Sequence, residues 1–566
     1  MSPLSELAHK VRAQLTAPGA PFETMEAEVD GRTVRVYRNA FPNLPALISS
    51  ARAHGAKPFI RFQGETWSFD RFFAEADAIA AQLRAWGVQP GDRVAIAMRN
   101  RPEWAVVFAA AALIGAVPAP LNSFGLGEEL HAAIDDVEPR VFACDAERLA
   151  RIEGNTRVAG CRILCVGEGD LPAAAADYRA LATQAAEPAP APALGPDDAA
   201  LILFTSGATS RAKGVLSSQR AVCQALFNID FIGALSGMTS PEAVAALMAK
   251  GLPPTTLTAV PLFHVSGLHA QLLNSLRNGR QLVFVTRWDP AQAIEVIREE
   301  RITQFNGAPS MVMQLLAQPG FDDPAQTGTL AGLGFGGAGL PQRLIEEVMR
   351  RRPNSLSGIG FGLTETNGVG SAVSGALFAY KPRSSGLTSP IVEVRIADTT
   401  GRALPPCEQG EIWLRGVTIM KGYWRNADAT AAAMQDGWFR TGDVGYVDEE
   451  GFLFVVDRIK DVINRCGEKI AAAEVESCLL LQPEVLEAAV FAVPDEETGE
   501  AIAAVVSVRE GSGLDAQTLR AHVGAHLAAY KVPAVVHVLT DALPRNPAGK
   551  LLKAQLRSAF IAATQA

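Results

Sequence analysis

The sequence predicts an α/β protein in which helices cover the faces of mostly parallel sheets. Short apolar segments alternate with longer helical patterns, as in the strand, helix and strand expected at residues 59–62, 69–86 and 93–97. Repeated alternation of this kind favours a parallel sheet. Residues 391–413 are instead rich in consecutive strands, which predicts a small antiparallel barrel or sheet. With 566 residues, the chain is too long for one core and should divide into several domain-sized units.

Other segments are expected to form helices or a connector. A polar helix is expected near residues 5–15. The alanine-rich run 104–117 stops at Pro118, short of the ~20 residues that span a bilayer, and is therefore expected to be a buried helix. The Ala-Pro repeats of residues 187–196 predict a stiff connector. The N-terminus has no basic segment followed by an apolar core, so we expect neither a signal peptide nor a transmembrane segment.

Charge and cysteine content narrow the function classes. The net charge of -9 argues against a protein that grips nucleic acid through phosphate contacts, although a few local cations can still hold an anionic ligand. The seven cysteines contain no CxxC pair. An odd, unpatterned set is typical of reduced thiols, so we expect a cytoplasmic protein.

The most informative stretch is the apolar segment 201–204 with the loop 205–214 that follows it. Four apolar residues predict a short buried strand. The loop is small, hydroxylated and glycine-containing and carries Lys213, a composition that suits a polyphosphate. A Walker A loop requires Gly-Lys-Ser/Thr, whereas Lys213 lies between Ala212 and Gly214. An ordinary strand-to-helix turn rich in Ser, Gly and Thr explains the loop equally well when it is considered alone.

Two further stretches contain residues suited to substrate binding. His264 follows the predicted strand 257–260, where it can orient a carboxylate or simply pack at a core edge. Residues 361–365, Phe-Gly-Leu-Thr-Glu, combine an aromatic face, a hydroxyl and a carboxylate. Such a set can stack a base, contact a phosphate and hold Mg²⁺, or it can be a loop with a solvated Glu365.

Residues 334–339 satisfy the pattern GxGxxG, and a helix is expected from Pro341. This pattern is the main argument for a nicotinamide-linked oxidoreductase. No acidic residue ends a second strand about 20 residues later, as that fingerprint requires.

His522 and His526 have the spacing of neighbours on one helix face and in principle share a metal ion. No third ligand and no glutamate between them is evident from the sequence. We therefore expect a surface or half-buried helix at this position.

Eight stretches, taken in order, resemble the acyl- and aryl-CoA synthetase branch of the adenylate-forming (ANL) superfamily. The resemblance covers roughly Pro58 to Arg557, and its specificity comes from order and spacing. The stretches are residues 205–214, 261–267, 361–365, 410–416, 422–424, 441–443, 457–476 and 544–550.

The resemblance implies a two-domain organisation. Residues 1–459 would form a large N-terminal domain of stacked, mostly parallel sheets with a small β-barrel. Residues 460–566 would form a small, mobile α+β C-terminal domain with its hinge at Lys460. The implied ligands are ATP, Mg²⁺ and coenzyme A, with a small carboxylic acid as substrate.

The resemblance also assigns roles to individual residues. Residues implied to hold the β- and γ-phosphates are Thr205, Ser206, Gly207, Thr209 and Lys213, and Thr364 would contact the α-phosphate. Residues implied on the nucleoside side are Phe361, Gly362 and the Gly336-Gly337-Ala338 backbone around adenine, with Asp443 and Arg458 at the ribose. The remaining implied roles are Glu365 as ligand of Mg²⁺, His264 beside the carboxylate, Lys550 at the reacting oxygens and Gly467 on the thiol path.

Some positions depart from the family pattern. In the phosphate loop, Ala208 stands where Ser or Thr is common in the family. Ser210 stands where glycine is common, and Ala212 where proline is common. We expect weaker ATP binding from these changes. Losing a hydroxyl removes a possible phosphate contact, a serine at positive φ costs roughly 1–2 kcal/mol, and losing the proline loosens the unbound loop by ~0.4–1 kcal/mol. Asn546 stands where threonine is frequent, and Ala471-Ala472 where Tyr-Pro is frequent.

The implied activity is that of an ATP-dependent acid–thiol ligase, which adenylates an acid and transfers the acyl group to coenzyme A, releasing AMP and pyrophosphate. Gly362 stands where acetate-using relatives carry a bulky aromatic residue, and residues 358–360 add little bulk. We therefore expect a hydrophobic acid, either a medium- or long-chain fatty acid within fatty acid metabolism or a bulky cyclic acid. Three alternative functions stay open: loading of a carrier protein, non-catalytic nucleotide binding and the oxidoreductase activity. The chain is also compatible with a homodimer.

Overall fold

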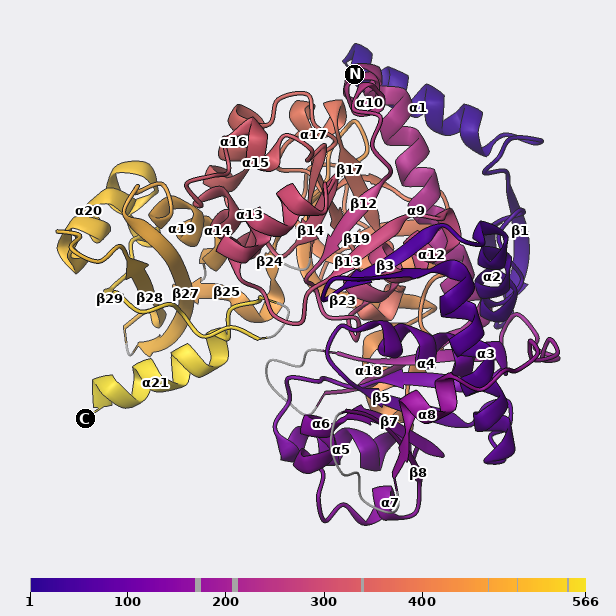
Figure 1. The fold of residues 1–566 in the computed structure, drawn as a ribbon. Helices are drawn as coiled ribbons and strands as arrows, with labels where there is room; N and C mark the ends of the chain where they lie inside the picture. Colours follow the sequence, from indigo (N-terminus) through magenta and orange to yellow (C-terminus); the bar gives the residue numbers. More distant parts are fainter. Residues whose placement is uncertain are drawn as a thin grey trace.

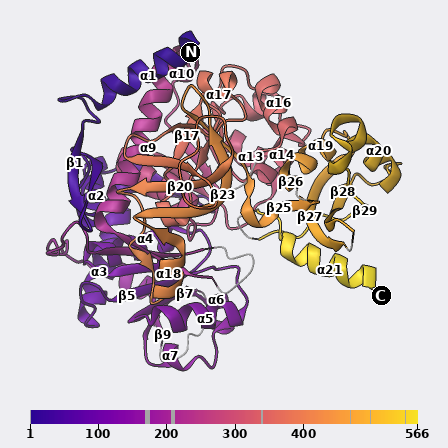
Figure 2. The same ribbon diagram turned by 180° about the vertical axis from the view of Figure 1, so that it is seen from behind.

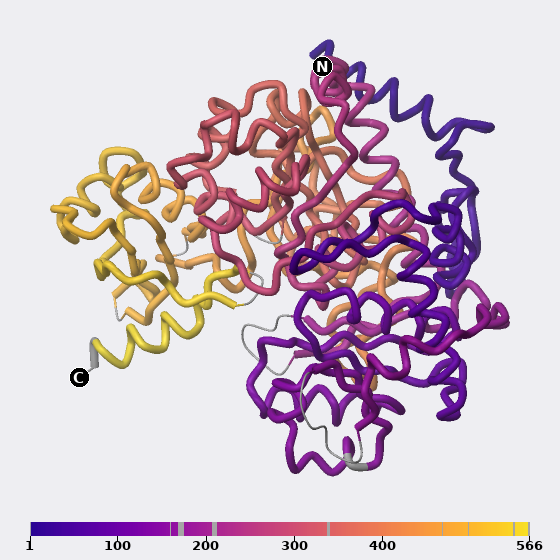
Figure 3. The backbone as a smooth tube through the Cα atoms, in the orientation of Figure 1, coloured from indigo at the N-terminus to yellow at the C-terminus, as the bar shows by residue number. Residues whose placement is uncertain are grey.

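The computed structural model describes residues 2–167, 175–205, 212–336, 340–466, 468–495, 497–546 and 549–565. The N-terminal four fifths of the chain form the larger body, and the C-terminal segment forms a smaller lobe beside it (Figures 1 and 3).

The larger body is built around a 14-stranded sheet whose middle is parallel. Six parallel neighbours follow one another in the order β3, β13, β12, β14, β15 and β16. Their bounds are β3 Pro58–Phe62, β12 Thr255–Thr258, β13 Gln281–Phe284, β14 Gln304–Gly307, β15 Gly332–Phe335 and β16 Gly358–Phe361. Because the carboxyl ends of parallel strands share one edge, the segments that follow β12, β14, β15 and β16 meet there.

Helices with one apolar face cover this part of the sheet. On α13 (Pro290–Glu299), α14 (Pro309–Leu316) and α16 (Gln342–Arg351), the buried residues are those that face the strands, such as Ile297, Leu315 and Leu344. They belong to one core with Leu257 and Phe305 of the sheet. The three helices lie together on one side of the strands (Figure 1).

The remainder of the large sheet is antiparallel. Strands β17, β18, β24, β23, β20 and β19 continue outward from β16 in that order. The strand-rich segment predicted from the sequence is therefore a real antiparallel unit, in which β20 and β23 lie side by side (Figure 2). The β18–β24 pairing joins this unit to the parallel strands. The bounds are β17 Ser371–Ser374, β18 Gly386–Thr388, β19 Val392–Ala397, β20 Gly410–Gly416, β23 Trp438–Val447 and β24 Phe452–Arg458.

A second, five-stranded sheet is parallel throughout, in the order β6, β5, β7, β8 and β9. Helix α4 (Pro102–Leu113) packs against α3 (Phe69–Ala85), and all its residues are buried, as predicted for this alanine-rich run. The strands are β5 Arg93–Ala97, β6 Val117–Pro120, β7 Val141–Asp145, β8 Arg162–Val166 and β9 Ala175–Asp177. The α/β prediction is confirmed for both sheets.

Strand β10 (Ala199–Phe204) is the buried apolar strand predicted before the phosphate loop. The chain returns from this loop as the antiparallel strand β11 (Gly214–Ser218) and only then enters α9 (Gln219–Thr239). A strand-to-helix turn, the simple alternative for this loop, is therefore wrong. The sequence analysis did not predict β11, because this strand is too short to be recognised from periodicity.

The smaller lobe is an α+β unit with its own core. Apolar residues from β25 to β29 and from two helices pack together, among them Ile463, Val490 and Leu519. The elements are β25 Val462–Arg465, β26 Glu468–Ala471, α19 Ala472–Leu479, β27 Val485–Asp495, β28 Gly499–Val508, α20 Ala516–His526, β29 Val535–Leu539 and α21 Lys553–Gln565. The 3₁₀ turn Ile459–Asp461, which contains Lys460, joins the lobe to β24. The hinge role of Lys460 stays a prediction.

The remaining elements complete the larger body. The predicted N-terminal polar helix is α1 (Pro3–Thr16), capped by the Ser2 side chain. Among the residues that the structure describes, α9 is the one helix long and apolar enough to cross a membrane, and 61% of its most apolar window is buried inside the protein. The other elements named here are β1 Thr24–Val29, β2 Arg32–Tyr37, α2 Leu44–Ser50, β4 Glu65–Ser68, α5 Gly127–Val137, α10 Pro241–Ala249, α12 Asn274–Asn278, α17 Ala376–Tyr380, β21 Gly422–Tyr423 and α18 Ala427–Ala433.

Candidate active site between the two lobes

A large cavity of about 3280 Å³ lies between the carboxyl edge of the large sheet and the smaller lobe. It collects side chains from stretches far apart in the sequence. The predicted site residues that line it are Thr205, Lys213, His264, Gly336, Phe361, Gly362, Thr364, Glu365, Asp443, Arg458, Lys460 and Lys550.

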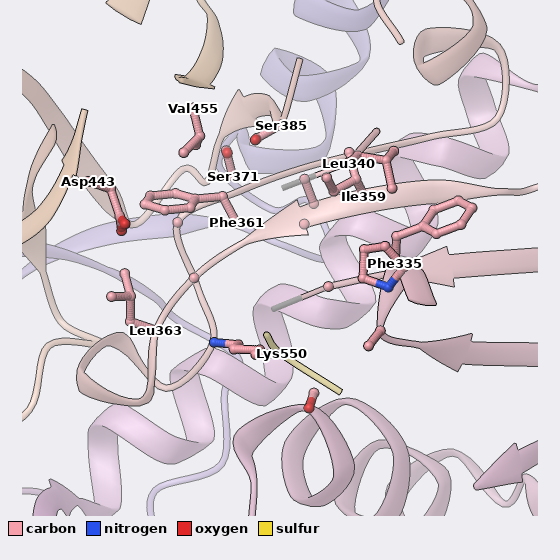
Figure 4. Close-up of a pocket in the computed structure, with 18 of the residues that line it drawn as sticks. Phe335, Leu340, Ile359, Phe361, Leu363, Ser371, Ser385, Asp443, Val455 and Lys550 are labelled. Atoms are coloured by element: carbon pink, nitrogen blue, oxygen red, sulfur yellow. The ribbon is translucent and has the colours of Figure 1, made fainter. Parts of the chain in front are cut away.

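Lys550 reaches this cavity on a tight loop of the smaller lobe (Figure 4). Asn546 closes the loop, because its side-chain Oδ1 accepts a hydrogen bond from the Lys550 backbone N–H at 2.9 Å while its own N–H donates to the Lys550 carbonyl at 2.8 Å. Arg545 anchors the loop to β27 through two hydrogen bonds to Glu487. The asparagine that departs from the family pattern therefore has a clear structural role here.

The Lys550 loop is docked directly on the larger body. Ser310, at the start of α14, donates a hydrogen bond from Oγ to the Gly549 carbonyl at 3.3 Å. Gly549 has φ +80°, and a Cβ added there would lie 2.8 Å from Cβ of Ala308. Only glycine combines this backbone conformation with such a close approach.

Lys550 and His264 form the electrostatic centre of the cavity. Burial lowers the pKa of Lys550, as does the charge of Arg458, while Asp443 and Glu365 oppose the change. Burial together with the Lys550 charge lowers the pKa of His264 to about 3. His264 is therefore a neutral imidazole at physiological pH. Its Nε2 is buried and has no hydrogen-bond partner among the described residues, which leaves it ready to contact a ligand.

Glu365 is linked to Lys213 through an aromatic residue that the sequence reasoning did not assign. The Tyr423 hydroxyl donates a hydrogen bond to Glu365 Oε1 at 2.8 Å, and the Lys213 ammonium lies 4.8 Å from the centre of the same ring. Burial and the Glu365 charge raise the pKa of Tyr423, so the hydroxyl stays protonated. Tyr423 belongs to the motif at residues 422–424, but its role appears only when β21 is placed beside β11.

The Glu365 carboxylate is a suitable ligand for a magnesium ion. Glu365 is 9% exposed and lines the cavity, and its carboxylate is a hard oxygen donor. Mg²⁺ is commonly bound by one or two carboxylates together with substrate phosphates. Glu365 would therefore hold the ion with the aid of the nucleotide.

Asp443 and Arg458 are paired across β23 and β24, with Arg458 Nε 2.8 Å from Asp443 Oδ1. Burial raises the pKa of Asp443, and the Arg458 charge opposes this effect. The Phe361 ring lies beside the Asp443 carboxylate, with Val455 on the same side (Figure 4). An aromatic face next to a carboxylate suits a nucleoside, because the ring can stack on a base and the carboxylate can accept from hydroxyl groups.

Several predicted residues lie outside the described part of the chain: Ser206, Gly207, Ala208, Thr209, Ser210, Gly337, Ala338 and Gly467. The base of the phosphate loop is described. The Thr205 N–H donates to the Lys213 carbonyl at 2.9 Å, and the Lys213 N–H donates to Thr205 Oγ1 at 3.2 Å. These two bonds hold the two ends of the loop together.

The structure corrects the reason given for Gly362. A Cβ at Gly362 would lie 2.3 Å from the Gly368 carbonyl, so close backbone packing requires glycine there. Its missing side chain therefore does not open the cavity. Space is present instead at Gly336, where no atom of the described residues lies within 4 Å of the position that a Cβ would take, and at Gly360, where the nearest described atom is 3.7 Å away.

Comparisons with known proteins agree with this geometry. Residues 47–424 match the family model described as AMP-binding enzyme, and residues 474–550 match the AMP-binding enzyme C-terminal domain. A feruloyl-CoA synthase of Amycolatopsis sp is 35% identical over 504 residues, covering 88% of this chain and 95% of that protein. An indoleacetate–CoA ligase of Aromatoleum aromaticum is 34% identical over 503 residues, covering 88% and 94%. The o-succinylbenzoate CoA synthetase of Bacillus subtilis, solved with its acyl-adenylate intermediate, is 29% identical with a TM-score of 0.74, covering 92% and 98%.

Proposed function

Because this chain belongs to the AMP-binding enzyme family, as an AMP-forming acid–CoA ligase, we propose that its substrate is an aromatic carboxylic acid. The enzyme would join this acid to coenzyme A while ATP is converted to AMP and pyrophosphate. The fatty acid expected as an alternative is the competing substrate class.

The observation that carries the catalytic assignment is the position of Lys550. A residue near the end of the chain shares one cavity with Glu365, His264 and the Asp443–Arg458 pair. The Lys550 charge lowers the pKa of His264 and opposes the burial-driven rise in the pKa of Asp443, while the charges of Asp443 and Glu365 oppose the lowering of the Lys550 pKa. A cation placed there before the reaction stabilises negative charge that develops on the substrates.

The chemistry divides into two steps. In the first step, a carboxylate oxygen attacks the α-phosphorus of ATP, an O–P bond forms, and the bond to pyrophosphate breaks. In the second step, the sulfur of coenzyme A attacks the activated carbonyl, the thiol proton is lost, and AMP leaves. Lys550 would offset charge on the reacting oxygens in the first step, and neutral His264 would border the acid carboxylate. Mg²⁺ held by Glu365 would neutralise phosphate charge when bound.

Two arguments support an aromatic acid. Relatives that match nearly the whole chain are named for ferulate and indoleacetate, both flat aromatic acids. The part of the cavity beyond Phe361 is bordered by Phe335, Leu340 and Ile359 (Figure 4). Gly336 and Gly360 also line the cavity. Glycines allow a flat ring to lie against the backbone, while apolar side chains favour its transfer from water.

A panel of acids tests the proposal. AMP release is measured with ferulate, indoleacetate, octanoate, palmitate and acetate, each with and without coenzyme A. We expect the highest kcat/KM with an aromatic acid and strong dependence on coenzyme A. A higher kcat/KM for octanoate or palmitate would contradict the aromatic assignment. AMP release that coenzyme A does not increase, together with transfer to a carrier protein, would contradict the choice of thiol.

We also propose that the protein is cytoplasmic and that it forms a homodimer. All seven cysteines are free thiols, which supports a reducing compartment. Cell fractionation and light scattering of the purified protein would test the two statements.

A further inference from the structure

Three side chains of the smaller lobe come together on two neighbouring helices, apart from the Lys550 loop. Cys478 lies near the end of α19, and His522 and His526 lie one turn apart on α20. One ligand atom from each of the three lies within 4.8 Å of the other two. Around tetrahedral zinc, neighbouring N and S ligand atoms are about 3.5 Å apart, so the three side chains would rotate closer together on binding a metal.

Hydrogen bonds to backbone carbonyls orient both imidazoles. His522 Nε2 lies 2.9 Å from the Cys478 carbonyl oxygen, and His526 Nδ1 lies 2.8 Å from the His522 carbonyl oxygen. A carbonyl only accepts, so both of these nitrogens carry hydrogen. This leaves the lone pairs of His522 Nδ1 and His526 Nε2. Metal-binding histidines are typically held in this way, with the second nitrogen donating to a carbonyl or carboxylate.

The other contacts of these side chains would allow a metal ion to bind. The Gln482 amide donates to His522 Nδ1 at 2.8 Å, so a metal would displace one neutral hydrogen bond. Cys478 is 4% exposed, whereas His526 is exposed. Cys478 and His526 also line the cavity between the lobes, which provides an entry path for a metal ion.

We propose that Cys478, His522 and His526 form a binding site for a divalent transition metal, with Zn²⁺ as the expected ion. One thiolate and two imidazoles match the ligand types of zinc, and water or another ligand would complete the tetrahedron on the exposed side. Binding would displace the Cys478 thiol proton, which burial and the Glu474 charge now hold in place by raising the pKa. The metal would join α19 to α20 and stabilise the smaller lobe. This site is additional to the proposed ligase function and supplies none of its chemistry.

Sequence reasoning rejected this site because no third ligand was evident. Cys478 lies 44 residues before His522, and only the packing of α19 against α20 brings the thiol to the histidine pair.

Metal titration of the full-length protein tests the site. Co²⁺ is added to the reduced, metal-free protein while absorbance is recorded, and Zn²⁺ is then added in competition. We expect one equivalent of Co²⁺ to produce a thiolate-to-metal charge-transfer band that Zn²⁺ abolishes. Zn²⁺ should also raise Tm and protect one buried thiol from alkylation.

Variants separate this site from adventitious binding. His526→Ala changes an exposed residue and should fold normally, and we expect it to weaken Zn²⁺ binding at least about 10-fold. Cys478→Ser should remove the charge-transfer band. Cys407→Ser, which changes an exposed thiol of the larger body, is the matched control and should keep both signals. The proposal is wrong if the wild-type protein gives no thiolate band, or if His526→Ala binds Zn²⁺ as tightly as the wild type.

Discussion

Ser310 and Gly549 connect the two lobes immediately beside Lys550. The Ser310 hydroxyl donates to the Gly549 carbonyl at 3.3 Å, and Arg545 of the smaller lobe donates to the same oxygen at 2.6 Å. One carbonyl is thus shared by a helix of the larger body and by the loop that carries Lys550. We therefore expect this docking to position the Lys550 ammonium.

Enlarging Gly549 should disturb the docking. In Gly549→Ala the new Cβ would meet Ala308 at 2.8 Å, in a backbone conformation that already costs a side chain about 1–2 kcal/mol. We expect adenylation to slow about 10-fold, measured as pyrophosphate release. Gly511→Ala, at φ +79° with nothing within 4 Å, reproduces the backbone strain without the contact and should stay near wild type. Equal losses in the two variants would mean that docking at Gly549 is unimportant.

The two half-reactions should depend on different residues. Lys550→Ala removes the cation that we propose acts on the reacting oxygens, so we expect adenylation to fall ~10²-fold or more. Thioester formation from supplied acyl-adenylate should stay nearly intact. Gly467→Leu should have the opposite effect if the thiol passes that position. Rapid-quench measurement of each half-reaction checks this, and equal slowing of both steps in both variants would exclude a swing of the smaller lobe about Lys460.

Tyr423 should act by holding Glu365. Tyr423→Phe deletes the hydrogen bond to Glu365 and keeps the aromatic ring near Lys213. A lost hydrogen bond to a charged group is worth about 1.5–3 kcal/mol, so kcat/KM for ATP should fall at least about 10-fold, with a greater requirement for Mg²⁺. Tyr423→Ala should be worse because the ring is also lost. Tyr530→Phe, on the surface of the smaller lobe, is the control, and an unchanged Mg²⁺ dependence in Tyr423→Phe would contradict the role.

Stability should depend on pH through a buried histidine. His269 is 1% exposed, and burial lowers its pKa to about 4, against the opposing effect of the Asn367 side chain. Below the unfolded-state pKa of about 6.5, the unfolded chain binds a proton that the folded protein does not. The free energy of unfolding should therefore fall as pH decreases from 6.5 toward 4, by up to about 1.4 kcal/mol per pH unit from this group. Urea unfolding of wild type and His269→Gln at several pH values would test this, since the variant should show a smaller slope; parallel curves would contradict it.

Bulk at Gly360 should narrow the acid specificity. The position lines the cavity, and the atom nearest to a new Cβ is 3.7 Å away, so the Cβ of Gly360→Val meets no backbone clash and its methyl groups add bulk at the cavity wall. Each methylene excluded from burial costs about 0.8 kcal/mol, so kcat/KM for a bulky aromatic acid should fall several-fold more than for a short acid. Gly513→Val, in an open surface position, is the control. A uniform loss for all acids would place Gly360 outside the acid site.

The sequence by itself determined the α/β class, the buried strand β10, the buried helix α4 and the family. These features are local: apolar periodicity defines an element, and the order of motifs defines the relatives. The sequence also indicated candidate site residues, and the structure shows that twelve of them line one cavity. Only the tertiary structure decided which groups meet.

Tyr423 reaches Glu365, Ser310 reaches Gly549, and Cys478 reaches His522 only because sheet pairing and core packing bring distant segments together. Gly362 is a further example of what the sequence alone could not reveal. A glycine is needed there because the Gly368 backbone approaches closely, not because a substrate needs the space. Spacing along the chain carries information about turns and faces. Contacts across tens or hundreds of residues depend on how the elements pack, which no local pattern specifies.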